Sequence, residues 1–293
     1  QGITPQPATA LAVFSAPSCF SLLDLESFIL FLHHSITDSY LKKVFLSEDR
    51  PVRLDKLLAH TGYGTRSEVK RLLKSKVVKI DGQVAKDAKV KVDLSSQVVT
   101  VFDEVVDYRE FVYIMMNKPQ NCLSATRDRD YRTVIDLLDE SYLIYDVAPA
   151  GRLDRDTEGL VLLTNDGKLA HEIISPKKEV YKHYRAHISG ELTKEAVKRL
   201  ENGVEILDGS NESFMTKPAK LQLIGSMDDL TVVDIWIMEG KFHQVKRMFA
   251  SVGCKVEYLK RLAIGELKLD ESLPLGGYRE LKDEELELLR RTV

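Results

Sequence analysis

Residues 151 to 167 place a polar, glycine-bounded loop directly before an apolar run. The loop carries Arg152 and Asp154, and residues 160–163 are all leucine or valine. A buried strand would fix the loop and exclude water, and a carboxylate in a dry site interacts with other charges more strongly than one in water. We therefore predict an active-site loop in which Asp154 is the reactive carboxylate, followed by a buried strand.

Three other segments accompany this loop in the order of a known family. They are Asn117-Lys118-Pro119, Lys182-His183-Tyr184 and residues 239–248, which read Glu-Gly-Lys-Phe-His-Gln-Val-Lys-Arg-Met. Together with Gly-Arg-Leu-Asp at 151–154, they resemble the pseudouridine synthases that modify ribosomal RNA, in the branch that includes the small-subunit enzyme RsuA. The resemblance runs from about Val52 to the C-terminal end, and the 239–248 segment looks more like the small-subunit enzyme than the large-subunit ones.

The resemblance implies a reaction and three catalytic residues. Such an enzyme detaches uracil from C1′ of a uridine, rotates it and rejoins it through C5, which needs no redox step and hence no cofactor. Asp154 would act as nucleophile or base, as the family assigns. Tyr184 would stack on a uracil flipped out of the RNA, although a tyrosine on a strand, taken alone, is more typical of a core. Lys246 would pair with Asp154 and keep it ionised and oriented.

Substrate contacts are expected from residues around these three. In an extended loop, Arg152 points to the same side as Asp154, where it could hold a phosphate of the flipped nucleotide. His243 is a candidate general acid, but we favour an RNA-contacting or structural histidine. Asn121 stands near where relatives often carry glycine, and asparagine tolerates the positive φ of a turn. The other residues assigned to substrate binding are Leu153, Asn117, Lys118 and Arg247.

Residues 52 to 101 have the pattern of a small RNA-binding module. A helix is predicted over 53–60, and Thr65-x-x-Glu68 is a capping box that begins a second helix running to about Lys76. The turn Asp81-Gly82 then predicts a hairpin. This order, with Arg-Leu-Asp-Lys-Leu-Leu at 53–58 and Val-x-Ile-Asp-Gly at 78–82, resembles the S4 RNA-binding domain.

Basic residues recur every four positions on the second helix of this module and therefore share one face. Such a face is usually only solvated, but the charge of the chain is uneven. Residues 52–94 carry 11 Lys or Arg against 5 Asp or Glu, whereas residues 95–293 have a net charge of −7 within a total of −3. Phosphate affinity should therefore be concentrated in the module. The residues predicted to bind RNA are Arg53, Lys56, Arg66, Lys70, Arg71 and Lys74.

The rest of the chain predicts an α+β protein. After the module we expect a linker over 102–111 and a catalytic domain over 112–293 built around a long, mainly antiparallel sheet. The expected strands are 112–116, 160–163, 184–188 and 230–238, and the expected helices are 133–138, 168–174, 192–202, 242–252 and 283–291.

Residues 1–51 are an extension to which we assign no function. Their apolar stretch 21–32 contains Asp24 and Glu26, lacks a basic region before it and is too short to span a bilayer. Three cysteines, Cys19, Cys122 and Cys254, do not suit a disulfide framework or a zinc site, so a reducing cytoplasm is expected. We expect a monomer whose partner is ribosomal RNA or an assembling ribosomal particle, with no metal and no membrane.

Several other functions compete with this interpretation. Asp154-x-Asp156-Thr157 matches the Asp-x-Asp-Thr of dehalogenase-type phosphohydrolases, but those enzymes need a buried parallel strand before the first Asp, and here the apolar run follows it. A metal-dependent nuclease could use Asp154, Asp156 and Glu158. A large-subunit enzyme of the same family and a non-catalytic RNA-binding assembly factor also remain, although the joint presence of Asp154, Tyr184 and Lys246 argues against an inert protein.

Overall fold

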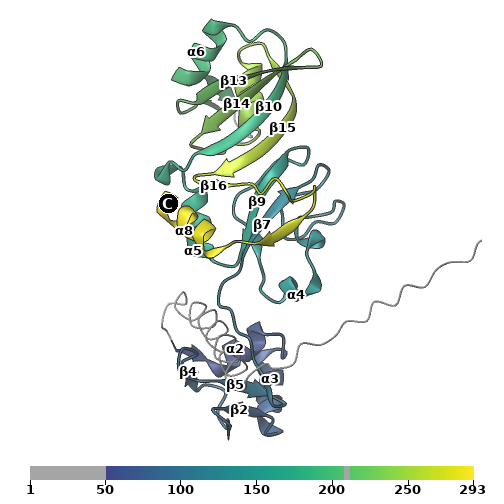
Figure 1. Cartoon of the computed structure of the whole chain (residues 1–293), viewed down its shortest axis with the longest axis vertical. Coiled ribbons are helices and arrows are strands. Elements are labelled where there is room, and N and C mark those ends of the chain that lie inside the picture. The colour runs from purple at the N-terminus through teal and green to yellow at the C-terminus, as the bar shows by residue number, and fades with distance from the viewer. Residues whose placement is uncertain (1–50, 208–211) are drawn as a thin grey trace, which may run out of the picture.

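A computed structural model describes residues 51–207 and 212–293. Figure 1 shows the small module containing α2 and α3 at one end and the body, built around a large sheet, at the other. The predicted N-terminal extension lies almost entirely outside the described residues, as does Cys19. Cys122 and Cys254 are buried and free. In the described part of the chain, no helix has the length and apolar character needed to cross a bilayer.

The module forms because two short amphipathic helices cover a small sheet. The capping box predicted at Thr65 and Glu68 is present and begins the second helix. Buried leucines and valines of both helices, including Leu57, Leu58 and Val69, pack on the sheet. The predicted Asp81-Gly82 hairpin is also present, with both residues at positive φ. The elements are β1 (Val52–Arg53), α2 (Leu54–His60), α3 (Arg66–Lys74), β2 (Val78–Ile80), β3 (Gln83–Val84), β4 (Lys91–Val92), β5 (Val99–Val101) and β6 (Glu104–Val105).

The predicted linker, residues 102–111, starts too early in the chain, because its first residues belong to the module. Phe102 and Asp103, both at positive φ, form a turn, after which β6 pairs antiparallel with β5. Val106 is buried in the module's core. The sequence did not predict this strand because a two-residue edge strand in an acidic stretch has almost no periodicity.

A sheet of nine strands forms the body, as the predicted mainly antiparallel architecture requires. Its path runs β13-β14-β10-β15-β9-β7-β17, with β16 beside β15 and β8 beside β9. All pairs are antiparallel except β15 with β9. The strands are β7 (Tyr113–Lys118), β8 (Ala148–Pro149), β9 (Glu158–Thr164), β10 (Lys182–Ser189), β13 (Lys220–Met227), β14 (Leu230–Ile237), β15 (Lys255–Ile264), β16 (Leu267–Lys268) and β17 (Tyr278–Glu280). A separate hairpin joins β11 (Glu205–Leu207) to β12 (Ser213–Met215).

The buried strand predicted after Asp154 is β9, and all seven of its residues are buried. Val161 and Leu163 face one core, which also contains residues of α6 and α7. Leu160 and Leu162 face a second core, which contains residues of α5 and α8. Burial on both faces explains why the strand is an uninterrupted apolar run. The helices are α4 (Glu140–Leu143), α5 (Gly167–Ile174), α6 (Lys194–Asn202), α7 (Gln244–Ala250) and α8 (Asp283–Thr292).

The helix expected over 133–138 is wrong. Only a 3₁₀ turn, η1 (Ile135–Leu137), forms there. Thr133 begins this turn because Asp136 accepts hydrogen bonds from its backbone N and its hydroxyl, at 2.7 and 2.9 Å. Leu138 is extended, which ends the helical conformation. A second 3₁₀ turn, η2 (Pro176–Lys178), follows α5.

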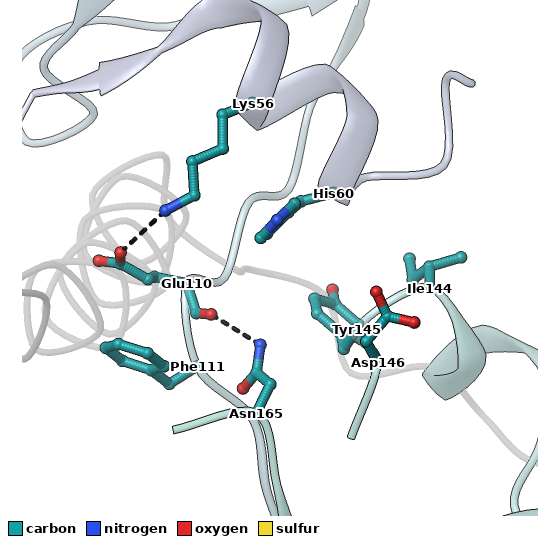
Figure 2. Close-up of a pocket in the computed structure, with 8 residues that line it drawn as sticks. All are labelled: Lys56, His60, Glu110, Phe111, Ile144, Tyr145, Asp146 and Asn165. Atoms are coloured by element: carbon teal, nitrogen blue, oxygen red, sulfur yellow. Dashed lines mark hydrogen bonds and ion pairs between the residues drawn. The ribbon is translucent and has the colours of Figure 1, made fainter. Parts of the chain in front are cut away.

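The module meets the body at a polar joint, which Figure 2 shows. Lys56 of α2 lies 3.5 Å from the carboxylate of Glu110, whose carbonyl accepts a 2.9 Å hydrogen bond from Asn165 at the end of β9. His60, Tyr145 and the other lining residues surround a cavity of about 280 Å³.

Candidate active site

The 151–157 loop is fixed by the strands on both sides of it and by Ser124. β8 pairs with the far end of β9, so the chain turns back through the loop into the same strand. The Ser124 hydroxyl donates to the carbonyl of Leu153 at 3.1 Å and accepts from its N–H at 3.0 Å. Thr157 N–H donates to the Asp154 carbonyl at 3.1 Å. These contacts define the backbone of Asp154.

Lys118, fully buried at the end of β7, supports the loop from beneath. Its ammonium donates to the carbonyls of Asp154, Arg155 and Thr157 at 3.0, 3.2 and 2.8 Å, and to that of Pro119 at 2.9 Å. Burial lowers the pKa of Lys118 to about 8. One buried cation thus satisfies carbonyls of the catalytic loop that would otherwise lack a partner.

The side chain of Asp154 faces two basic groups from the 239–248 segment. Its Oδ2 lies 3.2 Å from Lys246 Nζ, and its Oδ1 lies 3.6 Å from His243 Nε2. The ion pair predicted between Asp154 and Lys246 is therefore present. Lys246 also contacts Asp156 Oδ1 at 2.6 Å. Burial works to raise the pKa of Asp156, but the hydrogen bond and charge of Lys246 outweigh it, and the pKa is lowered.

Helix α7 holds Lys246 in place because its first turn is fixed by buried polar contacts. His243 precedes the helix at a positive φ of 49°. Gln244 is buried, donates to Glu239 at 2.8 Å and accepts from the N–H of Lys241 at 2.9 Å. The Glu-Gly-Lys-Phe-His-Gln segment is therefore a closed loop that leads into α7.

Tyr184 reaches the same place from β10. Along this strand alternate residues are buried, and Tyr184 belongs to the buried set with Ala186 and Ile188. Although it is only 7% exposed, it lines a depression of about 50 Å³ together with Asp154 and His243. Tyr184 is thus both part of the core and part of the pocket wall, so the two interpretations of this residue are compatible.

The other predicted substrate-binding residues divide into two groups. Arg152, which is exposed, and Leu153 line the depression with Asp154. Arg247 donates to the Leu207 carbonyl and lies over the exposed ring of Phe242. Asn117 and Lys118, which we assigned to substrate binding, are instead buried. Asn117 donates to the Leu273 carbonyl at 2.8 Å and Lys118 binds the loop, so both contact protein backbone where we had expected RNA.

The predicted RNA-binding residues of the module also divide. Arg66, Lys70, Arg71 and Lys74 are exposed on α3, as the four-residue spacing requires, while Val69 and Leu73 are buried beneath them. Arg53 is held by Asp55 through two hydrogen bonds, of 3.0 and 2.6 Å. Lys56 faces Glu110 in the joint. Of the six predicted residues, Arg66, Lys70 and Lys74 on α3 thus stay exposed with no acidic partner in the described part of the chain, while Arg71 lies 3.6 Å from Glu68.

The loop carboxylates do not converge on a common point. Asp156 binds Lys246, and Glu158 accepts a 2.7 Å hydrogen bond from the Tyr258 hydroxyl. Within residues 51–207 and 212–293, no group of three or more His, Cys, Asp or Glu has the arrangement of a metal site. The strand before Asp154 is β8, which pairs antiparallel with β9, whereas a dehalogenase-type site would have a parallel strand there.

The sequence did not predict the contacts that three residues make in the site. Asp156 shares Lys246 with Asp154, and its spacing of two from Asp154 in an extended loop could have indicated this. Gln244, the first residue of α7, was not singled out, and its partners Glu239 and Lys241 lie only three to five residues before it. Ser124 has no signal in the sequence, because its partner Leu153 lies 29 residues away and offers only backbone groups.

Comparison with known proteins agrees with the geometry. Residues 52–98 match the model of the S4 domain, and residues 112–251 match that of the RNA pseudouridylate synthases. The chain is 52% identical over 238 residues to an uncharacterized RNA pseudouridine synthase, YtzG, of Bacillus subtilis, covering 81% of this chain and 98% of that protein. It is 39% identical over 238 residues to the ribosomal small subunit pseudouridine synthase A of Haemophilus influenzae, covering 81% of this chain and 99% of the relative.

Comparison with a solved structure indicates the same family. The crystal structure of a pseudouridylate synthase superposes with a TM-score of 0.54 at 39% identity, covering 81% of this chain and 99% of that one. The relatives are matched over nearly their whole length, through both the module and the body. An RNA-binding S4 domain thus precedes a catalytic domain whose depression is lined by Asp154 and Tyr184, with Lys246 paired to that aspartate, and the chain belongs to the RNA pseudouridine synthase family.

Proposed function

We propose that this pseudouridine synthase isomerises one uridine of small-subunit ribosomal RNA, with Asp154 as the catalytic carboxylate. The observation that carries the proposal is that Asp154, which is paired with Lys246 at 3.2 Å, lines a depression open to solvent together with Tyr184. The choice of RNA is supported by the relative from Haemophilus influenzae, whose name states that it acts on the small ribosomal subunit.

The reaction breaks the C1′–N1 bond of the uridine and forms a C1′–C5 bond. The proton on C5 is lost and N1 gains one, so the product is an isomer of the substrate. Asp154 acts on the nucleoside as nucleophile or base, and Lys246 orients its carboxylate through a charge-assisted hydrogen bond. The ring of Tyr184 supports the uracil, which has to leave the RNA stack at a cost of a few kcal/mol.

A depression of about 50 Å³ is small for a nucleoside. We propose that the exposed Arg152 and the rim residue Lys241 move when RNA binds, because long side chains at a rim can change rotamer without a change of fold. The buried Tyr184 and the backbone beneath Asp154 stay in place.

The substrate is tested by mapping pseudouridines in ribosomal RNA from a strain that lacks the gene. We expect one pseudouridine to be missing from the small-subunit RNA and to return when the gene is restored. Loss of a pseudouridine from large-subunit RNA would identify the competing function within the family. An unchanged map would favour a non-catalytic assembly factor.

Asp154→Asn tests the catalytic assignment. The amide keeps the shape of the side chain but is neither nucleophile nor base at neutral pH, so product formation should stop while the Kd for RNA changes little. The restored strain should lack the pseudouridine when it carries this variant. Activity within about tenfold of wild type, or about 1.4 kcal/mol of barrier, would contradict the role of Asp154.

We propose that the enzyme acts as a monomer in the cytoplasm, where ribosomal RNA is modified. Sedimentation of the purified protein tests whether it is a monomer. A dimer at enzymatic concentrations would contradict it.

A further inference from the structure

An exposed loop over residues 125–132 lies beside the catalytic loop and is absent from the roles assigned so far. It reads Ala-Thr-Arg-Asp-Arg-Asp-Tyr-Arg, and all but its first residue are exposed. Its one aromatic residue, Tyr131, is 49% exposed. The guanidinium of Arg155 lies 4.7 Å from the centre of the Tyr131 ring. Since Arg155 directly follows Asp154, their Cα atoms are about 3.8 Å apart.

The loop is held in a defined conformation although it is exposed. At its base, Leu123 N–H donates to the Arg132 carbonyl and the Leu123 carbonyl accepts from Val134, both at 2.9 Å. At its tip, one carboxylate oxygen of Asp128 accepts from the N–H groups of Asp130 and Tyr131, both at 3.0 Å. A surface loop with these bonds presents the Tyr131 ring in a fixed position.

The two loops are also joined to each other. Ser124, next to the exposed loop, binds both the N–H and the carbonyl of Leu153, the residue before Asp154. Lys118 binds the carbonyl of Arg155 from below. The two loops that carry Tyr131 and Asp154 are therefore fixed relative to each other.

Five arginines without acidic partners lie on this loop and on the catalytic loop. In the described part of the chain, none of the five forms an ion pair, although the body as a whole is acidic. Other arginines of the body are held by carboxylates, as Arg185 is by Asp234 and Arg279 is by Glu285, or by backbone carbonyls, as Arg261 is by that of Leu160. Unpaired arginines on an acidic protein are available for phosphate. The five are Arg127, Arg129, Arg132, Arg152 and Arg155.

We propose that Tyr131 and Arg155 form a binding subsite for the nucleotide next to the reacting uridine, in addition to the pocket of the proposed function on which this inference rests. One face of the Tyr131 ring is covered by Arg155, and a base of single-stranded RNA stacks on the ring where it is exposed. The neighbouring arginines bind its phosphate. Stacking on an aromatic ring combined with cationic contacts to the backbone is the usual way in which proteins hold unpaired nucleotides.

The subsite also explains how the uridine can be flipped. Removing a base from the stack leaves its neighbour with one exposed face, which is costly in water. The Tyr131 ring covers that face while Asp154, on the adjoining loop, meets the flipped nucleotide. Tyr131 and Arg155 are thus positioning residues and take no part in the bond changes.

The test measures RNA binding and turnover separately. The probe is a transcript of small-subunit ribosomal RNA labelled with tritium at C5 of uridine, because the C5 proton leaves when the new bond forms. Tyr131→Ala should raise KM about tenfold, as expected for loss of one stacked base, and leave kcat within about twofold. Tyr131→Phe should match wild type, and Arg155→Ala should raise KM. Arg291→Ala, on exposed helix α8, is the control and should have no effect.

A second experiment shows whether the ring contacts the neighbouring base. Short RNAs carry the mapped uridine with an abasic nucleotide before or after it. At one of these positions the abasic change should raise KM about tenfold for wild type but cause no further rise for Tyr131→Ala, because both changes remove the same contact. Independent effects at both positions, or wild-type KM for Tyr131→Ala, would overturn the subsite.

Failure of the subsite can be told apart from failure of the proposed function. If wild type releases no tritium from small-subunit RNA, the proposed substrate is wrong, whatever Tyr131 does. The subsite is then judged by the Kd for the transcript in the Asp154→Asn protein, where no turnover occurs. An unchanged Kd after adding Tyr131→Ala to that protein would overturn it.

Discussion

Two lysines near Asp154 have opposite surroundings and therefore opposite consequences for the site. Lys246 is partly exposed and lies between the carboxylates of Asp154 and Asp156. It can exchange one partner for the other as a substrate enters. Lys118 is fully buried among backbone carbonyls and cannot leave them without exposing several unpaired acceptors. Lys246 can therefore respond to RNA, whereas Lys118 fixes the loop.

Replacement of Tyr184 should separate the contribution of its ring from that of its hydroxyl. Tyr184→Phe keeps the ring and should bind RNA as wild type does. Tyr184→Ala should weaken RNA binding by about 1–3 kcal/mol, the range for base–aromatic stacking. Filter binding measures the Kd values of both variants, and thermal unfolding checks that the core is intact. Full activity of the alanine variant would make Tyr184 a core residue only.

Lys118→Met should lower kcat by more than it changes KM for RNA. The variant fills the space but leaves the carbonyls of Asp154 and Thr157 without their donor, so the loop should lose its fixed geometry. Unpaired buried acceptors should also lower the free energy of unfolding by about 1–3 kcal/mol. Urea unfolding and steady-state kinetics measure the two effects. Unchanged kcat would show that β8 and Ser124 suffice to hold the loop.

At the scale of elements, the sequence predicted those with a clear period and missed those without one. The capping box at Thr65 and the run before Thr164 are local signals, and both were read correctly. Strand β13 was missed because most of its residues are exposed and its pattern does not alternate. Strand β15 was missed because it contains Arg261, which is buried only because its Nε binds the Leu160 carbonyl at 2.8 Å.

The site was predicted in the same uneven way. The types and order of residues predicted which side chains meet Asp154, since the resemblance supplied their register. The sequence could not predict that Lys118 lies under the loop. A lysine can be buried there only because the fold brings together the carbonyls of Pro119 and of the 154–157 turn. Such convergence of backbone groups has no signature in composition or spacing.

Gly159 should be the least replaceable residue of β9. Its φ is +102°, and a Cβ there would lie 2.2 Å from the Arg261 carbonyl oxygen of β15. This is the point where the only parallel pair of the described sheet joins its two antiparallel parts. Gly159→Ala should therefore lower the free energy of unfolding by more than about 2 kcal/mol, as strain and close backbone contact combine.

Gly167→Ala is the matched control for this substitution. Gly167 begins α5, and nothing lies within 4 Å of the Cβ that would be added. Alanine there should be neutral or stabilise by up to about 1 kcal/mol. Urea unfolding of both variants tests the comparison. Equal effects of the two changes would refute the close approach of β9 and β15.

Over the whole molecule, RNA attraction and chemistry are assigned to different parts. The basic face of α3 lies on the module, which carries +6 between residues 52 and 94, while the acidic body holds Asp154. We therefore expect the module to contribute RNA affinity and the body to carry out the reaction.

Reversing the charges of Arg66, Lys70 and Lys74 to glutamate should therefore raise KM and leave kcat unchanged. Each phosphate contact that is lost should remove roughly 0.7 to 0.9 from the slope of log affinity against log salt. Binding at several salt concentrations measures this slope. If it is unaltered, the α3 face is merely solvated and RNA docks on the body alone.

The position of β17 sets the order in which the enzyme can be completed during its synthesis. This strand, residues 278–280, pairs with β7, which ends at Lys118, about 160 residues earlier in the chain. Until residues 277–280 have emerged from the ribosome, β7 has an open edge, and the Gly277 carbonyl cannot accept the N–H of Asn117, which adjoins Lys118. Long-range pairing of this kind forms slowly. A nascent chain can thus fold its S4 domain and hold RNA well before it can modify it.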